Sequence, residues 1–439
     1  MQLLKTRLGR FWTSMTPGRV FMLLLILFEV GTLFLLVVTR GNALGDLLFH
    51  DRHDTLMDFF HPILGYETIS PDNLYTDATV FYPPLAMLLF YGLYRLIPEE
   101  LEFASPYEAR TEQFTLVMAL ICVVMLSVLM VLILMELRKG TATEQRIFAL
   151  CALLSYPMLY QLDRGNLILL AFLFTLLFVL WMDSESRVLR ELALISLALA
   201  FGLKGYPALF GVLLLIKRRW KESIRCAIYG LAAFLIPALF FEGIDLFGIL
   251  RDFGSMSDSV VTEGFGYKVN FSNTIRFLMT CMGIETGGQA LSSGLCFALG
   301  ILCLLAALVP GTLWKKLCLV AIVIAGVPGV SYAYVMMFFL IPAAVFLKET
   351  KGAEQRKGWD YVYAVLLVAC LAPLPFSGWR YVDKLGYPMT CTVLAEGLAI
   401  ILLAVLLIAD GAITGWRLLK QRGDGQVSST SQIQCPNND

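Results

Sequence analysis

Apolar stretches of about 15 to 25 residues recur along almost the whole chain, with short polar loops between them. Helices of this length match the ~30 Å hydrocarbon core of a bilayer. Only 15% of the residues are charged, against about 25% in soluble domains. We therefore predict an all-α fold, a polytopic helical membrane protein with about 11 to 13 transmembrane or re-entrant helices.

The polar stretches divide the chain into one membrane domain with two long loops. We predict a cytoplasmic N-terminus at residues 1–19, a single transmembrane domain at 20–422, external loops at 39–82 and 242–273, and a disordered C-terminal tail at 423–439. The first apolar segment is too long for a cleaved signal peptide, so we expect it to remain as a span. The formal net charge of zero gives no indication of nucleic-acid binding.

Lysine and arginine in the short loops indicate the cytoplasmic side. Basic clusters such as "KRRWK" (217–221) and "KETKGAEQRKG" (348–358) mark that side, and counting spans from them places 326–334, 377–388 and both long loops outside. The large loops are therefore expected to share the external face of the membrane.

The region between residues 83 and 216 allows two topologies. In the first, the segment at 83–97 and the segment interrupted at Gly205 and Pro207 each enter the bilayer and return on the same side. In the second, every segment crosses and two loops violate the charge rule. The sequence leaves both open.

The first external loop concentrates acidic side chains near the membrane surface. Most of them are expected to be solvated, but Asp58 precedes two phenylalanines in "MDFFHPI", which predicts a helix along the bilayer that begins at Asp58. The loop ends at Tyr82, and Pro83 and Pro84 begin the next helix without loss of a needed N–H. The cysteines lie mostly in apolar segments and only three histidines occur, so we predict no metal site and no cofactor.

An acid, a base and an amide stand directly before an apolar run in "YQLDRGNLILLAF". Asp163, Arg164 and Asn166 would be costly inside a membrane, at about 2.5 to 3.5 kcal/mol for a charge, and are therefore candidates for function. The alternative is that Asp163 and Arg164 only cap the following helix or reach an interface.

Lys204 interrupts the segment "LALAFGLKGYPALFGVLLLIKRRW" beside a helix break. About a dozen apolar residues flank it on each side, so its ammonium group is not expected to reach an interface. The alternative is a purely structural ion pair between Lys204 and Asp163. Segments 166–182 and 192–216 form a hairpin that turns near residue 187, which places Asn166 and Lys204 within about 6 Å in depth.

Two cations at one depth inside an apolar wall suggest an anionic ligand. A phosphate carried on a lipid is the simplest such ligand, gripped by the fork of Arg164 and the point charge of Lys204. A carboxylate from the external loop could then accept a proton from a hydroxyl group. Together these features indicate a transferase that uses a lipid-linked sugar.

The same residues resemble membrane glycosyltransferases of the GT-C superfamily, most closely glycosyltransferase family 87 (DUF2029). The similarity lies in "DRGNLILLAF", "GLKGYPALFGVLLLIKRRW", "YPPLAMLL" and "NFSNTIRFL", in this order over roughly residues 20 to 350. It implies a GT-C-type fold, a polyprenyl-phosphate sugar donor (usually of mannose), and a lipid or glycan acceptor at the external face of a bacterial plasma membrane. The partners are thus the donor, the acceptor and the bilayer.

The resemblance also implies roles for single residues. Asp58 would be the general base, and Arg164, Asn166, Lys204 and Tyr206 would bind the donor phosphate. The groove would be shaped by Tyr82, Pro83, Pro84, Gly165 and Pro207. The first loop lacks the DxD motif of metal-dependent members, and "SYAYVMMFFLIP" (331–342) has tyrosines where some members have histidine.

Two other functions remain compatible with the sequence. A transporter or flippase of lipid-linked substrates would also use broken helices and intramembrane charges, although no internal repeat is visible. A polymerase or ligase of lipid-linked glycans would share most of the predicted site.

Overall fold

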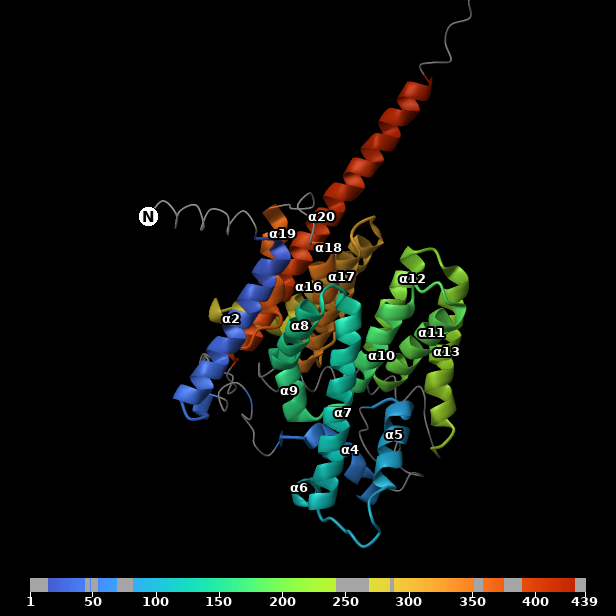
Figure 1. Cartoon of the computed structure of the whole chain (residues 1–439). Helices are drawn as coiled ribbons and strands as arrows, with labels where there is room; N and C mark the ends of the chain where they lie inside the picture. The colour runs from blue at the N-terminus through green and yellow to red at the C-terminus, as the bar shows by residue number, and fades with distance from the viewer. Residues whose placement is uncertain are drawn as a thin grey trace, which may run out of the picture.

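The computed structural model describes residues 15–43, 48, 54–68, 82–241, 268–284, 288–350, 358–374 and 389–430. These residues form helices joined by short connections, and their only strand-like pairing is an isolated bridge between Lys268 and Tyr332. The prediction of an all-α fold is confirmed (Figure 1).

The helices in chain order are α2 (Pro17–Val38), α4 (Met57–Thr68), α5 (Pro84–Tyr94), α6 (Pro106–Thr111), α7 (Gln113–Arg138), α8 (Ala142–Leu154), α9 (Tyr156–Arg164), α10 (Ile168–Trp181), α11 (Arg187–Leu203), the 3-10 helix η2 (Tyr206–Gly211), α12 (Val212–Ile216), α13 (Trp220–Ala238), α15 (Phe271–Cys281), α16 (Gly288–Leu308), α17 (Leu313–Gly326), the 3-10 helix η3 (Ala333–Phe339), α18 (Leu340–Glu349), α19 (Gly358–Ala369) and α20 (Cys391–Thr430).

Among the described residues, four helices are long and apolar enough to cross a membrane: α2, α7, α16 from Leu291, and α20 as far as Gln421. Their outward faces carry large exposed apolar side chains, among them Phe34, Val124 and Phe297. Apolar surface of this extent on the outside of a helical bundle is suited to lipid rather than water. The protein is therefore a polytopic membrane protein.

Two apolar stretches do not form single helices of membrane length. The segment at 147–162 divides between α8 and α9 at Ser155, where Pro157 lies in the first turn of the second helix. The segment at 83–97 contains only the 11 residues of α5, a length of about 16 Å. This helix cannot cross a ~30 Å core by itself.

The chain from residue 187 to residue 216 enters and leaves the bundle at the same end. It runs along α11, breaks at Lys204 and Gly205, and returns through η2 and α12, which pack against α11 and α13. Lys217 and Arg219, which follow α12, form ion pairs with Asp183, which precedes α11. The segment is therefore a hairpin whose two ends lie together, as the first of the two topologies above requires.

The hairpin changes the depth expected for Lys204. The sequence suggested a lysine in the middle of one long span, but the apolar residues after it run back beside those before it. Since α11 has 17 residues, Lys204 lies about 25 Å from the basic end of the hairpin, at its tip.

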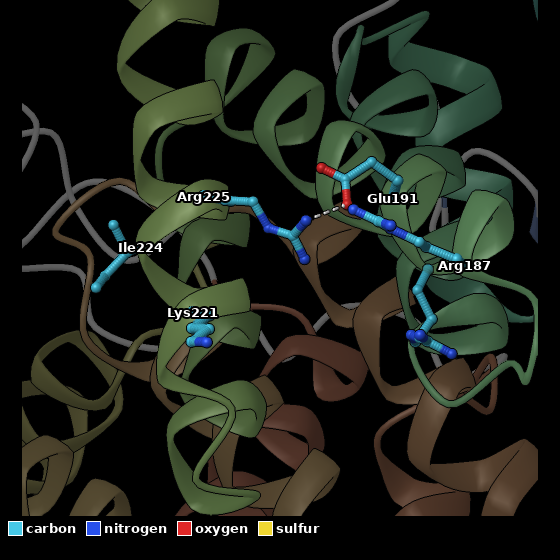
Figure 2. Close-up of a pocket in the computed structure, with 6 residues that line it drawn as sticks. Arg187, Glu191, Lys221, Ile224 and Arg225 are labelled. Atoms are coloured by element: carbon cyan, nitrogen blue, oxygen red, sulfur yellow. Dashed lines mark ion pairs between the residues drawn. The ribbon is translucent and has the colours of Figure 1, made fainter.

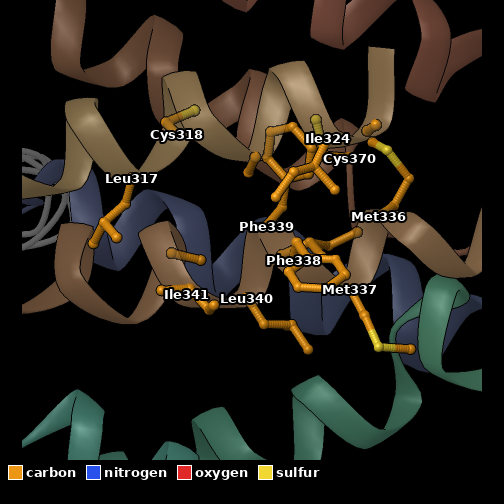
Figure 3. Close-up of a cluster of buried hydrophobic side chains, with 14 of the residues drawn as sticks. Leu317, Cys318, Ile324, Met336, Met337, Phe338, Phe339, Leu340, Ile341 and Cys370 are labelled. Atoms are coloured by element: carbon orange, nitrogen blue, oxygen red, sulfur yellow. The ribbon is translucent and has the colours of Figure 1, made fainter. Parts of the chain in front are cut away.

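The core beneath the tip is closely packed by η3, α17 and α18. Met336, Met337, Phe338 and Phe339 of η3 are fully or almost fully buried (Figure 3). Phe338 contacts Phe172 and Phe210 ring to ring. Because packed interiors resist deformation, η3 is a rigid support for the residues that precede it.

The C-terminal helix continues past residue 422, the predicted end of the membrane domain. We expected a disordered tail after residue 422, but α20 continues to Thr430 and its last turns project from the bundle (Figure 1). Adding residues to an existing helix requires no new nucleus, so it costs little even where the sequence is polar. The remainder of the predicted tail and the predicted loop at 377–388 lie outside the described residues.

Candidate functional site

A cavity of about 690 Å³ lies where the hairpin tip meets the predicted external loops. It is lined by the start of α4, the residues before α5, the turn between α9 and α10, the tip at 204–206, and residues 328–335. Ligand sites in proteins commonly have volumes of about 300 to 1,000 Å³. The lining includes Asp54, Asp58, Tyr82, Pro83, Arg164, Asn166, Lys204, Tyr206, Tyr332 and Tyr334.

Asp58 is held at one edge of this cavity by two side chains. It lies in the first turn of α4, where the helix dipole favours a negative charge. Arg164 Nη2 lies 2.6 Å from Asp58 Oδ1, and Asn166 Nδ2 donates to Asp58 Oδ2 at 2.7 Å. Charge-assisted bonds to both oxygens fix the carboxylate in one orientation.

Arg164 also contacts a second acid. Its Nη1 forms an ion pair with Asp54, whose side chain is 45% exposed, whereas that of Asp58 is 17% exposed. The guanidinium thus bridges a mostly buried and a half-exposed carboxylate. Of the two, Asp54 is the one that water or a ligand can reach more easily.

The three residues Arg164, Gly165 and Asn166 build this part of the site together. Gly165 ends α9 in the left-handed conformation, with φ of 65°, and so turns the chain. Asn166 Oδ1 then accepts a hydrogen bond from the N–H of Ile168 at 2.9 Å, which starts α10. Both ends of the Asn166 amide are therefore engaged, one with the helix and one with Asp58.

The turn before α4 is fastened to the end of α9. Leu56 has a φ of 61°, which is unfavourable for leucine. Its N–H donates to the backbone oxygen of Asp163 at 2.7 Å, and the Thr55 hydroxyl donates to Asp163 Oδ1 at 3.0 Å. Arg110 adds a bond to the Thr55 carbonyl at 3.0 Å. Asp163 thus positions the turn that carries Asp58.

Lys204 projects into the cavity from the break between α11 and η2. Its Nζ lies 4.2 Å from the centre of the Tyr82 ring, and a cation over an aromatic face is stabilised by the ring quadrupole. It forms no ion pair with any residue that the structure describes, so the structural pair with Asp163 is not observed. Lys204 therefore presents its positive charge to the cavity, where the Asp58 carboxylate acts on it electrostatically without forming an ion pair.

Tyr82 lies between Lys204 and Phe90 of α5. Burial raises the pKa of its phenol well above the ordinary value, and the nearby Asp58 carboxylate raises it further. The ring is therefore neutral and packs edge-on against Phe90 of α5.

The far wall of the cavity comes from residues that the sequence did not assign to the site. Tyr332 and Tyr334 line it, and Tyr334 stacks on Tyr160 with ring centres 5.8 Å apart. Asn270 Nδ2 donates to the Gly329 carbonyl at 2.8 Å, so the "NFSN" motif fastens this wall. The alternating tyrosines of "SYAY" in a predicted external loop were the available signal.

Three predicted groove residues lie outside the cavity lining. Pro84 is the first residue of α5, and Pro207 is buried in the first turn of η2. Gly165 lines a separate apolar cavity of about 160 Å³ beside α5 and α7. These three residues shape the backbone, whereas Pro83 and Tyr82 contact the cavity itself.

Replacing Gly165 with alanine is expected to destabilise the protein by about 1 to 3 kcal/mol. A β-carbon there would lie 3.1 Å from Leu56 Cδ2 and 3.3 Å from Phe59 Cβ, in addition to the positive φ. Gly205→Ala is the matched control, because Gly205 has a φ of −54° and no neighbour within 4 Å. Melting temperatures in detergent measure both, and an equal effect of the two substitutions would contradict the prediction.

No group of three or more His, Cys, Asp or Glu side chains lies close enough to hold a metal ion in the part of the chain that the structure describes. The acids Asp54 and Asp58 instead share the guanidinium of Arg164.

Comparison with known proteins identifies the family. The model of glycosyltransferase family 87 matches residues 80–327, more than half of the 439-residue chain. This range includes Tyr82, Arg164, Asn166, Lys204 and Tyr206 but ends before the far wall of the cavity. No curated protein and no solved structure matches the chain. The extent of the family match establishes that the chain belongs to glycosyltransferase family 87.

Proposed function

We propose that this glycosyltransferase transfers a sugar, mannose by its family resemblance, from a polyprenyl-phosphate donor to a lipid or glycan acceptor. The proposed site is the external face of a bacterial plasma membrane. One observation carries the proposal: a single cavity contains the doubly held carboxylate of Asp58 and the unpaired ammonium of Lys204. Such a cavity can bind a phosphate and accept a proton at the same time.

Asp58 is the proposed general base. The acceptor hydroxyl attacks the anomeric carbon of the donor sugar, and its proton passes to Asp58. The bond between that carbon and the phosphate oxygen breaks, and polyprenyl phosphate leaves with the electron pair. Attack from the face opposite the leaving group inverts the anomeric centre, as with a single-displacement carboxylate base.

Lys204 and Tyr206 are the proposed phosphate ligands. A lysine ammonium stabilises the charge that develops on the leaving phosphate, and Lys204 forms no ion pair with the described residues, although Asp58 acts on it electrostatically. Arg164 can join them if its Nη1 exchanges the half-exposed Asp54 for the phosphate while Nη2 keeps Asp58. Asn166 is assigned to positioning Asp58, because its amide is engaged at both ends.

The remaining residues of the cavity lining suit the sugar and the isoprenoid chain of a lipid-linked sugar. Tyr332 and Tyr334 combine flat apolar faces with hydroxyl groups, a combination that contacts both the C–H face and the hydroxyls of a sugar. Phe201 and Phe234 offer an apolar surface beside Lys204 for the first isoprene units.

Transfer assays in membranes with a panel of polyprenyl-phosphate sugars test this proposal. We expect wild-type membranes to transfer a sugar from a polyprenyl-phosphate donor. We expect membranes that contain Asp58→Asn to lose this transfer. Transfer that occurs only from nucleotide sugars would refute the proposed donor.

Transfer is expected to persist when divalent metals are removed. The proposal places Arg164 and Lys204 where metal-dependent enzymes place a cation to neutralise the leaving phosphate. The assay compares rates before and after EDTA, and loss of transfer with recovery on addition of Mg²⁺ or Mn²⁺ would contradict it.

A further inference from the structure

A second charged pocket lies at the other end of this hairpin, between the starts of α11 and α13. It has a volume of about 400 Å³ and is lined by Arg187, Arg190, Glu191, Lys221, Ile224 and Arg225. Figure 2 shows Lys221, Ile224 and Arg225 on one helix, with Arg187 and Glu191 on its neighbour. The 17 residues of α11 separate this pocket from the candidate active site.

The pocket has more positive charge than its acids neutralise. Arg225 pairs with Glu191 at 2.9 Å, and Arg190 approaches Glu222 at 3.7 Å. Glu191 also accepts a hydrogen bond from the Tyr229 hydroxyl. Arg187 and Lys221 form no ion pair with the residues that the structure describes, and both are exposed. Two cations are thus available to an anionic ligand.

An apolar stripe leads away from the pocket along α13. Ile224, Ile228 and Leu231 are 61%, 57% and 58% exposed, and their spacing places them on one face of the helix. Trp220 is also exposed at the start of α13, and tryptophan favours the boundary between headgroups and acyl chains. The pocket therefore lies where a polar edge meets a lipid-facing surface.

We infer that this pocket binds the headgroup of an anionic phospholipid, with the phosphate between Arg187 and Lys221 and an acyl chain along Ile224, Ile228 and Leu231. Basic pockets between membrane helices at the cytoplasmic side suit such headgroups. The apolar stripe distinguishes a lipid from free phosphate, because only a lipid places a chain against it. This inference does not depend on the proposed sugar transfer.

Thermal stability in detergent, with and without added phosphatidylglycerol, tests the inference. The lipid is expected to raise the melting temperature of the wild type, because a ligand that binds only the folded state stabilises it. In Arg187→Gln/Lys221→Gln the apparent affinity should fall by about 10-fold or more. Neither residue has an ionic partner among the described residues to leave stranded, so the variant should fold.

Matched variants separate this site from general charge effects. Arg146→Gln/Lys348→Gln removes two exposed cations outside the pocket and should keep the wild-type response. Arg187→Lys/Lys221→Arg preserves both charges and should retain most of the affinity. An unchanged response in Arg187→Gln/Lys221→Gln would overturn the inference, as would equal stabilisation by phosphatidylcholine or by inorganic phosphate.

Discussion

Replacing Asp58 with asparagine is expected to lower the rate of sugar transfer by about 100-fold or more while the protein remains folded. Asparagine has nearly the same shape and can still accept a hydrogen bond from Arg164, but it cannot take the proton of the acceptor hydroxyl. Donor affinity should change little, because the proposed phosphate contacts come from Lys204 and Tyr206. Turnover at saturating donor measures the effect, and the melting temperature in detergent verifies the fold.

The neighbouring acid provides the control for this experiment. Asp54 pairs with the same arginine as Asp58 but is more exposed, and it lacks the second bond that Asn166 gives to Asp58. Asp54→Asn is therefore expected to reduce turnover by less than about 10-fold. The reverse order of effects would assign the base to Asp54, and near-normal turnover in both variants would remove this carboxylate pair from the mechanism.

The sequence predicted the features that depend on local pattern. Apolar segments of membrane length identified the fold, since a bilayer permits few other arrangements. The helix start at Asp58 followed from "MDFFHPI", and α4 begins at Met57. The shared cavity of Asn166 and Lys204 followed from counting residues on either side of one turn, because helices advance by a constant 1.5 Å per residue.

The sequence could not predict the partners of the charged residues. Arg164 and Asp58 are 106 positions apart, and any of several loop acids could have met the arginine. The choice depends on the turn at Thr55 and Leu56, where Leu56 has a φ that its residue type disfavours. Such a conformation persists only when surrounding structure imposes it, so no local pattern indicates it.

The sequence also could not predict that the chain reverses direction at Lys204. The sequence at this point contains a glycine and a proline, which are compatible with a kink in one span as well as with a return. The return is held by the ion pairs of Asp183 with Lys217 and Arg219 at the opposite end. Those residues belong to basic and acidic loops whose pairing is settled only when the helices pack.

Replacing Lys204 is expected to impair donor binding, whereas replacing Arg164 is expected to impair turnover. Lys204→Gln should raise the KM for the donor by about 10- to 100-fold, since it removes a charge-assisted contact to the phosphate. It should leave stability unchanged or raised, because an unpaired cation is removed from a partly buried site. Donor titrations and melting temperatures measure both effects.

Arg164→Gln should mainly lower kcat and stability. It removes the bonds that hold Asp58 and Asp54, so the base loses its orientation and one mostly buried carboxylate loses its charged partner, at about 1 to 3 kcal/mol. Arg164→Lys should restore only part of the activity, because an ammonium group lacks the planar fork that reaches two carboxylates at once.

The double replacement tests whether both cations reach one phosphate. If Arg164 exchanges Asp54 for the donor, both cations act on the same phosphate. The loss of donor affinity in the double variant will then differ from the sum of the losses in the two single variants. If Arg164 acts only through Asp58, its loss will appear in kcat and leave the donor KM of Lys204→Gln unchanged. Unaltered donor affinity in both single variants would refute the phosphate site. Asp163→Ala should then destabilise the turn at Thr55 without affecting donor binding, because it removes the oxygen that accepts from the Thr55 hydroxyl.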